Sequence, residues 1–222
     1  MNDLKNLKII LLGDSITEGV GASEKKFCYA EVLAQETGMQ VLNYGVGGTR
    51  IARQERKSAV PSWDEDFNTR ARRMEKTADI VAVFGGTNDY GHGFAPVGTP
   101  DDQGEDTFYG AINSLFSYLR KTYPTSFLFV MTPIHRVNEQ RLTGDGYKPA
   151  MLPLKGYVDI IREVAEKYSI PVLDLYKNAG IYPDFEEHRV AYAPDGLHPN
   201  DRGHRKLALL VKNFLEQNYL TE

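Results

Sequence analysis

The stretch Lys8-Ile-Ile-Leu-Leu-Gly-Asp-Ser15 decides the fold. Its first five residues are almost continuously apolar, which is typical of a strand buried on both faces of a sheet. Gly13 ends the run, and Ser15 stands in the turn before the next helix. In an open parallel sheet, ligands bind beyond the carboxyl ends of the strands. The stretch therefore predicts a central strand that delivers a hydroxyl group to the ligand-binding edge.

Short apolar runs alternate with longer amphipathic segments through the rest of the chain. The runs are bounded by Gly, Asn, Asp or Pro, and they cover residues 40–43, 79–84, 127–131 and 170–173. Helices are predicted over residues 27–37, 63–76, 107–122, 152–168 and 203–219, and in the last three of these segments apolar residues recur at helical spacing. Five alternations of strand and helix predict an α/β fold, with a parallel sheet covered by helices on both faces.

Two long connections leave the carboxyl ends of predicted strands, at residues 90–106 and 134–151. Long connections inside compact domains are usually functional or disordered, so these two are expected to shape a pocket. The chain shows no internal repeat and no low-complexity segment. Its 222 residues are therefore interpreted as a single domain, residues 1–222, that carries loop insertions near 90–106 and 134–151.

Composition excludes several classes of protein. A net charge of −4 argues against a nucleic-acid partner, which would need a dense basic face. The most basic stretch, residues 70–76, is interpreted as a solvated helix face because acidic residues lie within and before it. One cysteine allows neither an internal disulfide nor a thiolate zinc cluster. No segment is predicted to be a signal peptide or membrane span, so a cytoplasmic location and no membrane partner are expected.

Four short motifs carry residues suited to acyl transfer. Ser15 needs a base, and His198 follows Asp195 at a spacing that lets the carboxylate hold one ring nitrogen. Gly48 ends a glycine-rich turn after the second strand, where backbone N–H groups can approach a ligand. Asn88 follows the third strand and can donate from its side chain. Each motif alone is also compatible with ordinary turn chemistry.

Other polar and aromatic residues near the strand ends have simpler interpretations. Asp14 and Asp89 are expected to hold loop backbone through local hydrogen bonds.

The arginines near the strand ends are expected at the solvated surface, although they could contact an acidic or sugar substrate; they are Arg50, Arg53 and Arg136. The aromatic residues of the connection at 90–106 could stack on a sugar ring, but such residues more often pack their own loop; they are Tyr90, His92 and Phe94. The remaining histidines lack ligand spacing, so no metal site is expected.

Together, Gly13-Asp-Ser15, Asn43 to Gly48, Gly86-Thr-Asn-Asp89 and Asp195 to His198 resemble the four sequence blocks of the GDSL, or SGNH, hydrolase family, in the family's order. The resemblance runs from residue 8 to about residue 205. It implies a flavodoxin-like fold, a three-layer sandwich whose five parallel strands lie in the order 2-1-3-4-5. It also implies that no metal or organic cofactor is needed.

By the same resemblance, Ser15 is the nucleophile, His198 the general base and Asp195 the residue that orients it. The oxyanion donors would be the backbone N–H groups of Ser15 and Gly48 and the side chain of Asn88. The predicted activity is that of a serine esterase that forms an acyl-enzyme from a small-molecule ester, preferably a short acyl group such as acetyl on a sugar or small metabolite. Two alternatives stay open: an acyltransferase with the same intermediate, and a carbohydrate- or ligand-binding module with a vestigial triad. The sequence does not indicate an oligomeric state.

Overall fold

A five-stranded parallel sheet lies at the centre of the computed structural model, which describes residues 4–146 and 152–219. Its strand order is β2-β1-β3-β4-β5, as predicted. The strands are β1 (Lys8–Gly13), β2 (Gln40–Gly45), β3 (Ile80–Phe84), β4 (Phe127–Met131) and β5 (Val172–Leu173). All five residues of β3 are buried, which explains why the central runs show no polar alternation.

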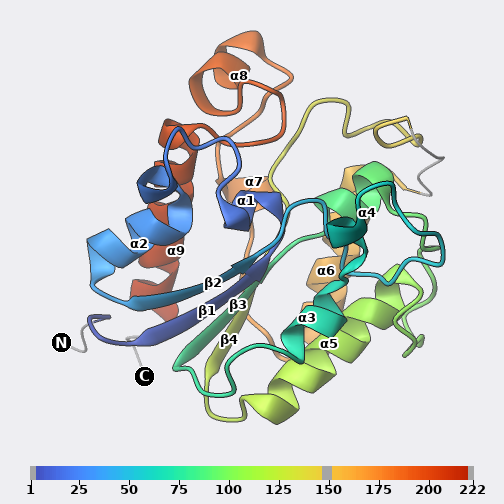
Figure 1. The fold of residues 1–222 in the computed structure, drawn as a ribbon, viewed down its shortest axis with the longest axis horizontal. Coiled ribbons are helices and arrows are strands. Elements are labelled where there is room, and N and C mark those ends of the chain that lie inside the picture. The colour runs from blue at the N-terminus through green and yellow to red at the C-terminus, as the bar shows by residue number, and fades with distance from the viewer. Residues whose placement is uncertain (1–3, 147–151, 220–222) are drawn as a thin grey trace.

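Helices cover both faces of the sheet (Figure 1). One layer contains α1 (Ser15–Glu18), α2 (Tyr29–Thr37), α7 (Leu175–Asn178) and α9 (Asp201–Asn218). The other contains α3 (Phe67–Ala71), α4 (Thr87–His92), α5 (Phe108–Thr122) and α6 (Leu154–Lys167). Successive β1 residues point to opposite faces, so Ile9 and Leu11 join the first core while Ile10 and Leu12 join the second. The predicted three-layer sandwich is confirmed.

The helix predicted over residues 63–76 is broken in the structure. A short 3₁₀ turn, η2 (Pro61–Asp64), is followed by α3, and Asp66 caps α3 by accepting the Thr69 N–H at 2.9 Å. Asp64 and Asp66 favour this break, because Asp is a strong N-cap residue but is unfavourable inside a helix. The interpretation of residues 70–76 as a solvated face fails at Arg70, which is only 5% exposed.

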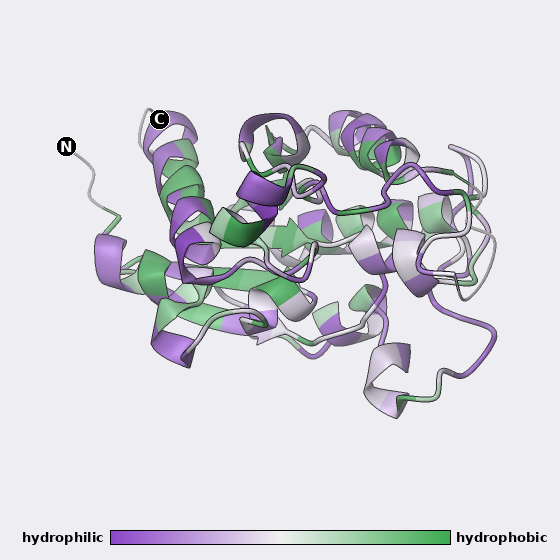
Figure 2. Ribbon diagram, turned by 90° about the horizontal axis from the view of Figure 1, so that it is seen from above, coloured by the Kyte–Doolittle hydropathy of each residue, from purple (hydrophilic) through white to green (hydrophobic). Residues whose placement is uncertain are grey.

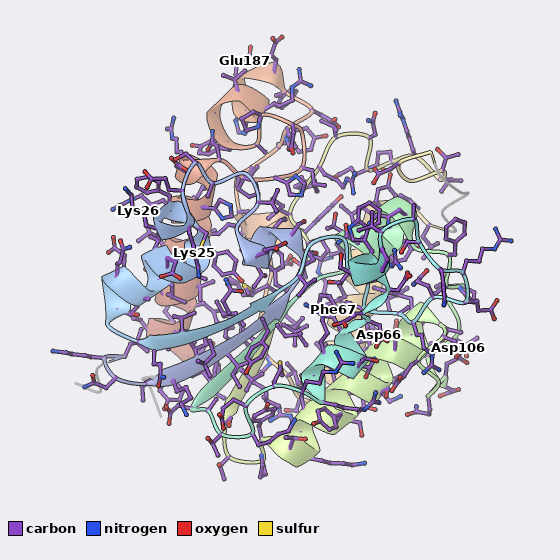
Figure 3. All side chains as sticks on the ribbon, viewed as in Figure 1. Lys25, Lys26, Asp66, Phe67, Asp106 and Glu187 are labelled. Atoms are coloured by element: carbon purple, nitrogen blue, oxygen red, sulfur yellow. The ribbon has the colours of Figure 1, made fainter. Side chains whose placement is uncertain are left out.

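The two long connections differ from the simple loops that were predicted. Residues 90–92 belong to α4, so the first connection begins at Gly93. The second includes residues 147–151, which lie outside the described residues. Four further short elements were not predicted: α1, which begins at Ser15 where a turn was expected, η1 (Lys25–Phe27), α7 and α8 (Glu186–Tyr192). In Figure 2 the strands are mostly green between helices striped purple and green, and in Figure 3 charged side chains such as Lys26 and Glu187 point outward.

The register of the sheet brings the carboxyl ends of its strands to one edge. Gly13 pairs with Gly45 of β2 and with Phe84 of β3. Phe84 in turn pairs with Met131 of β4. The turns after β1, β2 and β3 therefore begin at one level, and the candidate site lies there. Within the described residues, no helix is both long and apolar enough to cross a bilayer.

Candidate active site

Ser15 is the first residue of α1, and the turn that presents it depends on its two neighbours. A Cβ at Gly13 would lie 1.9 Å from the Thr17 hydroxyl oxygen, so only glycine allows α1 to start this close to β1. Asp14 is the N-cap of α1 and accepts the Ile16 N–H at 3.0 Å. The first N–H groups of a helix have no partner within the helix, so the Ser15 N–H remains available to a ligand.

His198 connects Ser15 to Asp195. The Ser15 Oγ lies 3.0 Å from His198 Nε2, although the two residues are 183 positions apart in the chain. On the other side of the ring, His198 Nδ1 lies 2.6 Å from Asp195 Oδ2. The other carboxylate oxygen, Asp195 Oδ1, accepts the backbone N–H groups of Leu197 at 2.8 Å and of His198 at 2.7 Å. The structure thus brings the three predicted residues into one hydrogen-bonded chain.

The charge on Asp195 fixes the tautomer of His198. Partial burial would raise the pKa of Asp195, but the hydrogen bonds from the His198 ring and from two backbone N–H groups outweigh it and lower the pKa to about 2. An ionised carboxylate only accepts hydrogen bonds, so His198 Nδ1 carries the proton. The lone pair on Nε2 then faces the Ser15 hydroxyl, which is the arrangement a general base requires.

Asn88 approaches the same point from the third strand end. It lies in the first turn of α4, which begins after Gly86, a residue with a φ of 107°. Its Nδ2 donates one hydrogen to the carbonyl oxygen of Thr49 at 3.0 Å. A side-chain amide has two such hydrogens, so this bond orients the group and leaves the second hydrogen for a ligand. Asn88 is only 5% exposed, and a hydrogen bond from it would be little weakened by water.

The adjacent glycines Gly47 and Gly48 have different roles in the structure. The Gly47 N–H donates to Glu18 Oε2 at 2.7 Å and is therefore occupied. No acceptor for the Gly48 N–H lies among the described residues. Gly48 has a φ of 73°, and a Cβ there would meet the Trp63 ring at 2.2 Å, so both the backbone and the packing require glycine. Of the two, Gly48 is the one whose N–H remains available for an oxyanion.

Two buried carboxylates brace these turns. Asp14 does so through the local hydrogen bond that was expected, whereas the bonds of Asp89 reach a segment 37 and 38 positions away and were not expected. Asp89 accepts the N–H groups of Ile51 at 3.0 Å and Ala52 at 2.9 Å, which fixes the segment that follows Gly48. Burial raises the pKa of Asp89 to about 6 despite those two bonds. Burial likewise raises the pKa of Asp14 to about 6, although its Ile16 hydrogen bond and the nearby positive charges oppose the change. Both side chains therefore carry their charge at a cost.

Arginine placement corrects part of the sequence interpretation. Arg53 is exposed, as expected, but Arg50 and Arg136 are only 2% and 5% exposed. Arg50 pairs with Asp64 at 2.9 Å, and Arg136 pairs with Asp145. Their burial was not predicted because each ion pair depends on the packing of two segments against each other, which the sequence pattern does not specify.

Glu18 and Arg70 also support the site and were missed in the sequence. Glu18 holds the Gly47 N–H, 29 positions away. Arg70 donates to the carbonyl oxygens of Gly13 at 2.7 Å and Tyr44 at 2.9 Å, and so joins the ends of β1 and β2. No local signal could have found either residue, because each acts on backbone that is distant in the sequence.

The aromatic residues of α4 and the following loop divide between packing and exposure. Tyr90 is buried, and its hydroxyl donates to the carbonyl oxygens of Asn138 at 2.6 Å and Arg141 at 3.0 Å. It thus packs the second connection against α4. His92 and Phe94 instead line a cavity, and Phe94 is 41% exposed. Across the described part of the chain, no cluster of His, Cys, Asp or Glu could hold a metal ion.

Comparison with known proteins shows the family of the chain. Residues 11–206 match the model of the GDSL-like lipase/acylhydrolase family. The chain belongs to this family. No curated protein matches it at a significant level.

Several solved structures are similar over nearly the whole chain. A protein from Lactobacillus plantarum is 29% identical, with 98% of this chain and 99% of that one covered and a TM-score of 0.82. The lipase/acylhydrolase from Enterococcus faecalis is 20% identical, with 95% and 96% covered and a TM-score of 0.64. The acetyl xylan esterase AlAXEase is also 20% identical, with 94% and 100% covered and a TM-score of 0.61. At 20% identity, the Enterococcus faecalis protein and the acetyl xylan esterase support the shared fold and no more.

Proposed function

We propose that the protein is a serine carboxylic ester hydrolase that works through an acyl-enzyme at Ser15. The observation that carries the proposal is the continuous chain from Ser15 Oγ through His198 to Asp195, with distances of 3.0 and 2.6 Å. Family membership supports hydrolysis of acyl esters in general. The geometry at the sheet edge supports the roles proposed for individual residues.

In the first half-reaction, the Ser15 oxygen attacks the ester carbonyl carbon while His198 Nε2 takes the hydroxyl proton. The carbonyl oxygen gains a negative charge, which the N–H groups of Ser15 and Gly48 and the Asn88 amide stabilise. His198, now a cation stabilised by Asp195, gives its proton to the alcohol oxygen as the ester bond breaks. The alcohol leaves, and the acyl group remains on Ser15.

In the second half-reaction, water takes the place of the alcohol. His198 Nε2 removes a proton from the water, whose oxygen attacks the acyl carbon. The same donors stabilise the second oxyanion. His198 then returns the proton to Ser15 Oγ, the acyl–oxygen bond to Ser15 breaks, and the carboxylic acid leaves. An acyltransferase would share the first half-reaction and use an alcohol acceptor in the second.

The proposed substrates are esters of short acyl groups, acetyl included, on a sugar or small metabolite. The polar character of residues 90–106 favours this choice over long alkyl chains. The name of one structural relative, acetyl xylan esterase, is consistent with it. The alternative is a carbohydrate- or ligand-binding module in which the triad is vestigial, and a fluorophosphonate probe that labels Ser15 would exclude it.

The experiment is hydrolysis of p-nitrophenyl esters from acetate to palmitate, with wild type and Ser15→Ala measured in parallel. Wild type should prefer the short esters, and the variant should lose roughly 10³-fold or more in kcat because the nucleophile is gone. Circular dichroism should show that the variant remains folded. Full activity in Ser15→Ala would reject the nucleophile, and a strong preference for palmitate would reject the substrate class.

A further inference from the structure

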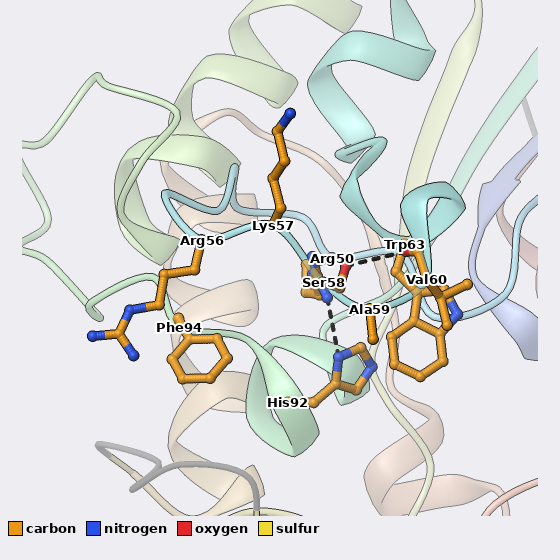
Figure 4. A pocket seen from close by; sticks show the side chains of 9 residues that line it. All are labelled: Arg50, Arg56, Lys57, Ser58, Ala59, Val60, Trp63, His92 and Phe94. Carbon is orange, nitrogen blue, oxygen red and sulfur yellow. Dashed lines mark hydrogen bonds between the residues drawn. The ribbon is translucent and has the colours of Figure 1, made fainter.

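A cavity of about 330 Å³ lies beside the candidate active site (Figure 4). Its volume is at the lower end of the range for small-molecule sites, which suits a ring-sized group. Apolar and aromatic side chains form most of its walls, and three cationic residues complete them. The lining residues are Arg50, Arg56, Lys57, Ser58, Ala59, Val60, Trp63, His92 and Phe94.

Two connections place this cavity next to the oxyanion donors. Gly48 lies against the Trp63 ring, which would be 2.2 Å from a Cβ at that position. Asn88 and His92 are four residues apart in α4, so they share one face of the helix and are separated by a rise of about 6 Å. A substrate whose carbonyl oxygen meets Gly48 and Asn88 could therefore extend a neighbouring group into the cavity.

The floor of the cavity is a preorganised polar cluster. Arg50 donates from Nη2 to Asp64 Oδ1 at 2.9 Å and from Nη1 to His92 Nδ1 at 3.1 Å. Because a guanidinium can only donate, His92 Nδ1 is the acceptor in this bond. Asp64 also accepts the Ser58 N–H at 3.1 Å, which ties the wall segment to the floor. The charge of Arg50 is thus balanced by Asp64.

The mouth of the cavity carries positive charge, and none of the lining residues that the structure describes is acidic. Arg56 and Lys57 are exposed, and the Arg56 guanidinium lies 5.3 Å from the centre of the Phe94 ring. Lys57 points away from the rings in Figure 4, but its four-carbon stem is flexible enough to turn toward a ligand. In a chain with a net charge of −4, this cationic mouth is a local feature rather than a general property of the surface.

We propose that this cavity is a specificity pocket for esters that carry an anionic group, such as a carboxylate, on a ring-sized apolar body. The body would pack against Trp63, His92 and Phe94, while the anion would meet Arg56 and Lys57. This inference rests on the proposed esterase function for its substrate role, but occupancy of the pocket can be measured without turnover.

Trp63 makes that measurement direct, because it is the only tryptophan in the chain. Benzoate, titrated at low ionic strength, should change the Trp63 fluorescence saturably, whereas neutral benzamide should bind at least roughly threefold more weakly. The double variant Arg56→Gln/Lys57→Gln should weaken benzoate roughly tenfold and leave benzamide unchanged. The matched control is Arg53→Gln, because Arg53 is an exposed arginine in the same segment that pairs with Glu105.

Saturable benzoate binding that is weakened roughly tenfold in the double variant and unchanged in Arg53→Gln would support the proposal. Equal affinity for benzoate and benzamide, or no response to either, would overturn it. The same titration in Ser15→Ala keeps this result separate from the proposed function, since the pocket contains no residue of the triad.

Two pairs of substrates then identify which side of the ester carries the anion. A charge on the acyl side is tested with p-nitrophenyl hemiglutarate against p-nitrophenyl butyrate. A charge on the alcohol side is tested with 4-acetoxybenzoate against 4-acetoxybenzamide. In one pair the anionic ester should have the lower KM, and the double variant should remove that advantage without changing kcat for the neutral ester. If neutral esters are hydrolysed and neither pair shows the advantage, the pocket proposal fails and the esterase proposal stands.

Discussion

The His198 loop and the turns at the strand ends both use aspartate, but in opposite environments. The side chain of Asp195 is 55% exposed and accepts three hydrogen bonds, and its pKa falls to about 2. Asp14 and Asp89 are 2% and 4% exposed, and burial raises the pKa of each to about 6. The charged form of aspartate is therefore stabilised in the His198 loop, whereas in the strand-end turns burial makes ionisation cost free energy.

The difference reflects what each carboxylate is placed to do. Asp195 faces a histidine that becomes a cation during the proposed reaction, so it must remain ionised across the working pH range. Asp14 and Asp89 instead accept backbone N–H groups and fix the turns that carry the nucleophile and the oxyanion donors. Exposure to solvent and three hydrogen bonds favour the charged form of Asp195. Asp14 and Asp89 hold backbone N–H groups in a buried environment, which disfavours their charged forms.

Removing the charge from the His198 loop should have the largest effect. Asp195→Asn should lower kcat roughly 10³-fold or more, because an amide cannot both fix the His198 tautomer and stabilise its cation. Some stability should also be lost at neutral pH, because the lowered pKa of Asp195 means that its charged form stabilises the folded state. Circular dichroism therefore has to show that the variant is folded under the assay conditions. Steady-state kinetics with a neutral ester, measured at one pH for both proteins, gives kcat and kcat/KM and checks the assignment. A variant with wild-type kcat would remove Asp195 from the mechanism.

Removing a donor from the strand-end turns should have a smaller effect. Asn88→Ala should lower kcat about 100-fold or more, because one oxyanion hydrogen bond is lost from a site shielded from water. KM should change little, since the bond forms mainly in the transition state. Steady-state kinetics with a short ester measures both constants. An unchanged kcat would exclude Asn88 as a donor.

The cost of a buried carboxylate can be measured through stability. Asp14→Asn keeps an effective N-cap but removes a charged group whose folded-state pKa is raised. The raised pKa means that the folded state binds the proton more tightly, so wild-type stability should fall as pH rises from about 4 to about 6. The variant should therefore be more stable than wild type at pH 8, on the order of 1–3 kcal/mol, with the difference shrinking toward about pH 4. Urea unfolding at both pH values tests this, and a difference that is independent of pH would contradict it.

The apolar runs predicted the parallel sheet and the meeting of the four motifs at one edge, because buried parallel strands are nearly continuous apolar runs. The order of the strands was implied by the family resemblance alone. Local hydrogen bonds of Asp14 were also predictable from its position in a turn. The burial of Arg50 and Arg70 and the bond from Gly47 to Glu18 were not. These depend on contacts between segments far apart in the chain, which periodicity and turn chemistry do not describe.

The acyl-enzyme at Ser15 is the central claim, and trapping it is the most direct test. Wild type and Ser15→Ala would be mixed with excess p-nitrophenyl acetate, quenched in acid within the first turnover and examined by intact-mass and peptide mass spectrometry. The account predicts a burst of p-nitrophenol and a mass gain of one acetyl group on the peptide containing Ser15, both absent from the variant. Turnover without acetylation of Ser15, or acetylation at another residue that supports the same rate, would contradict it.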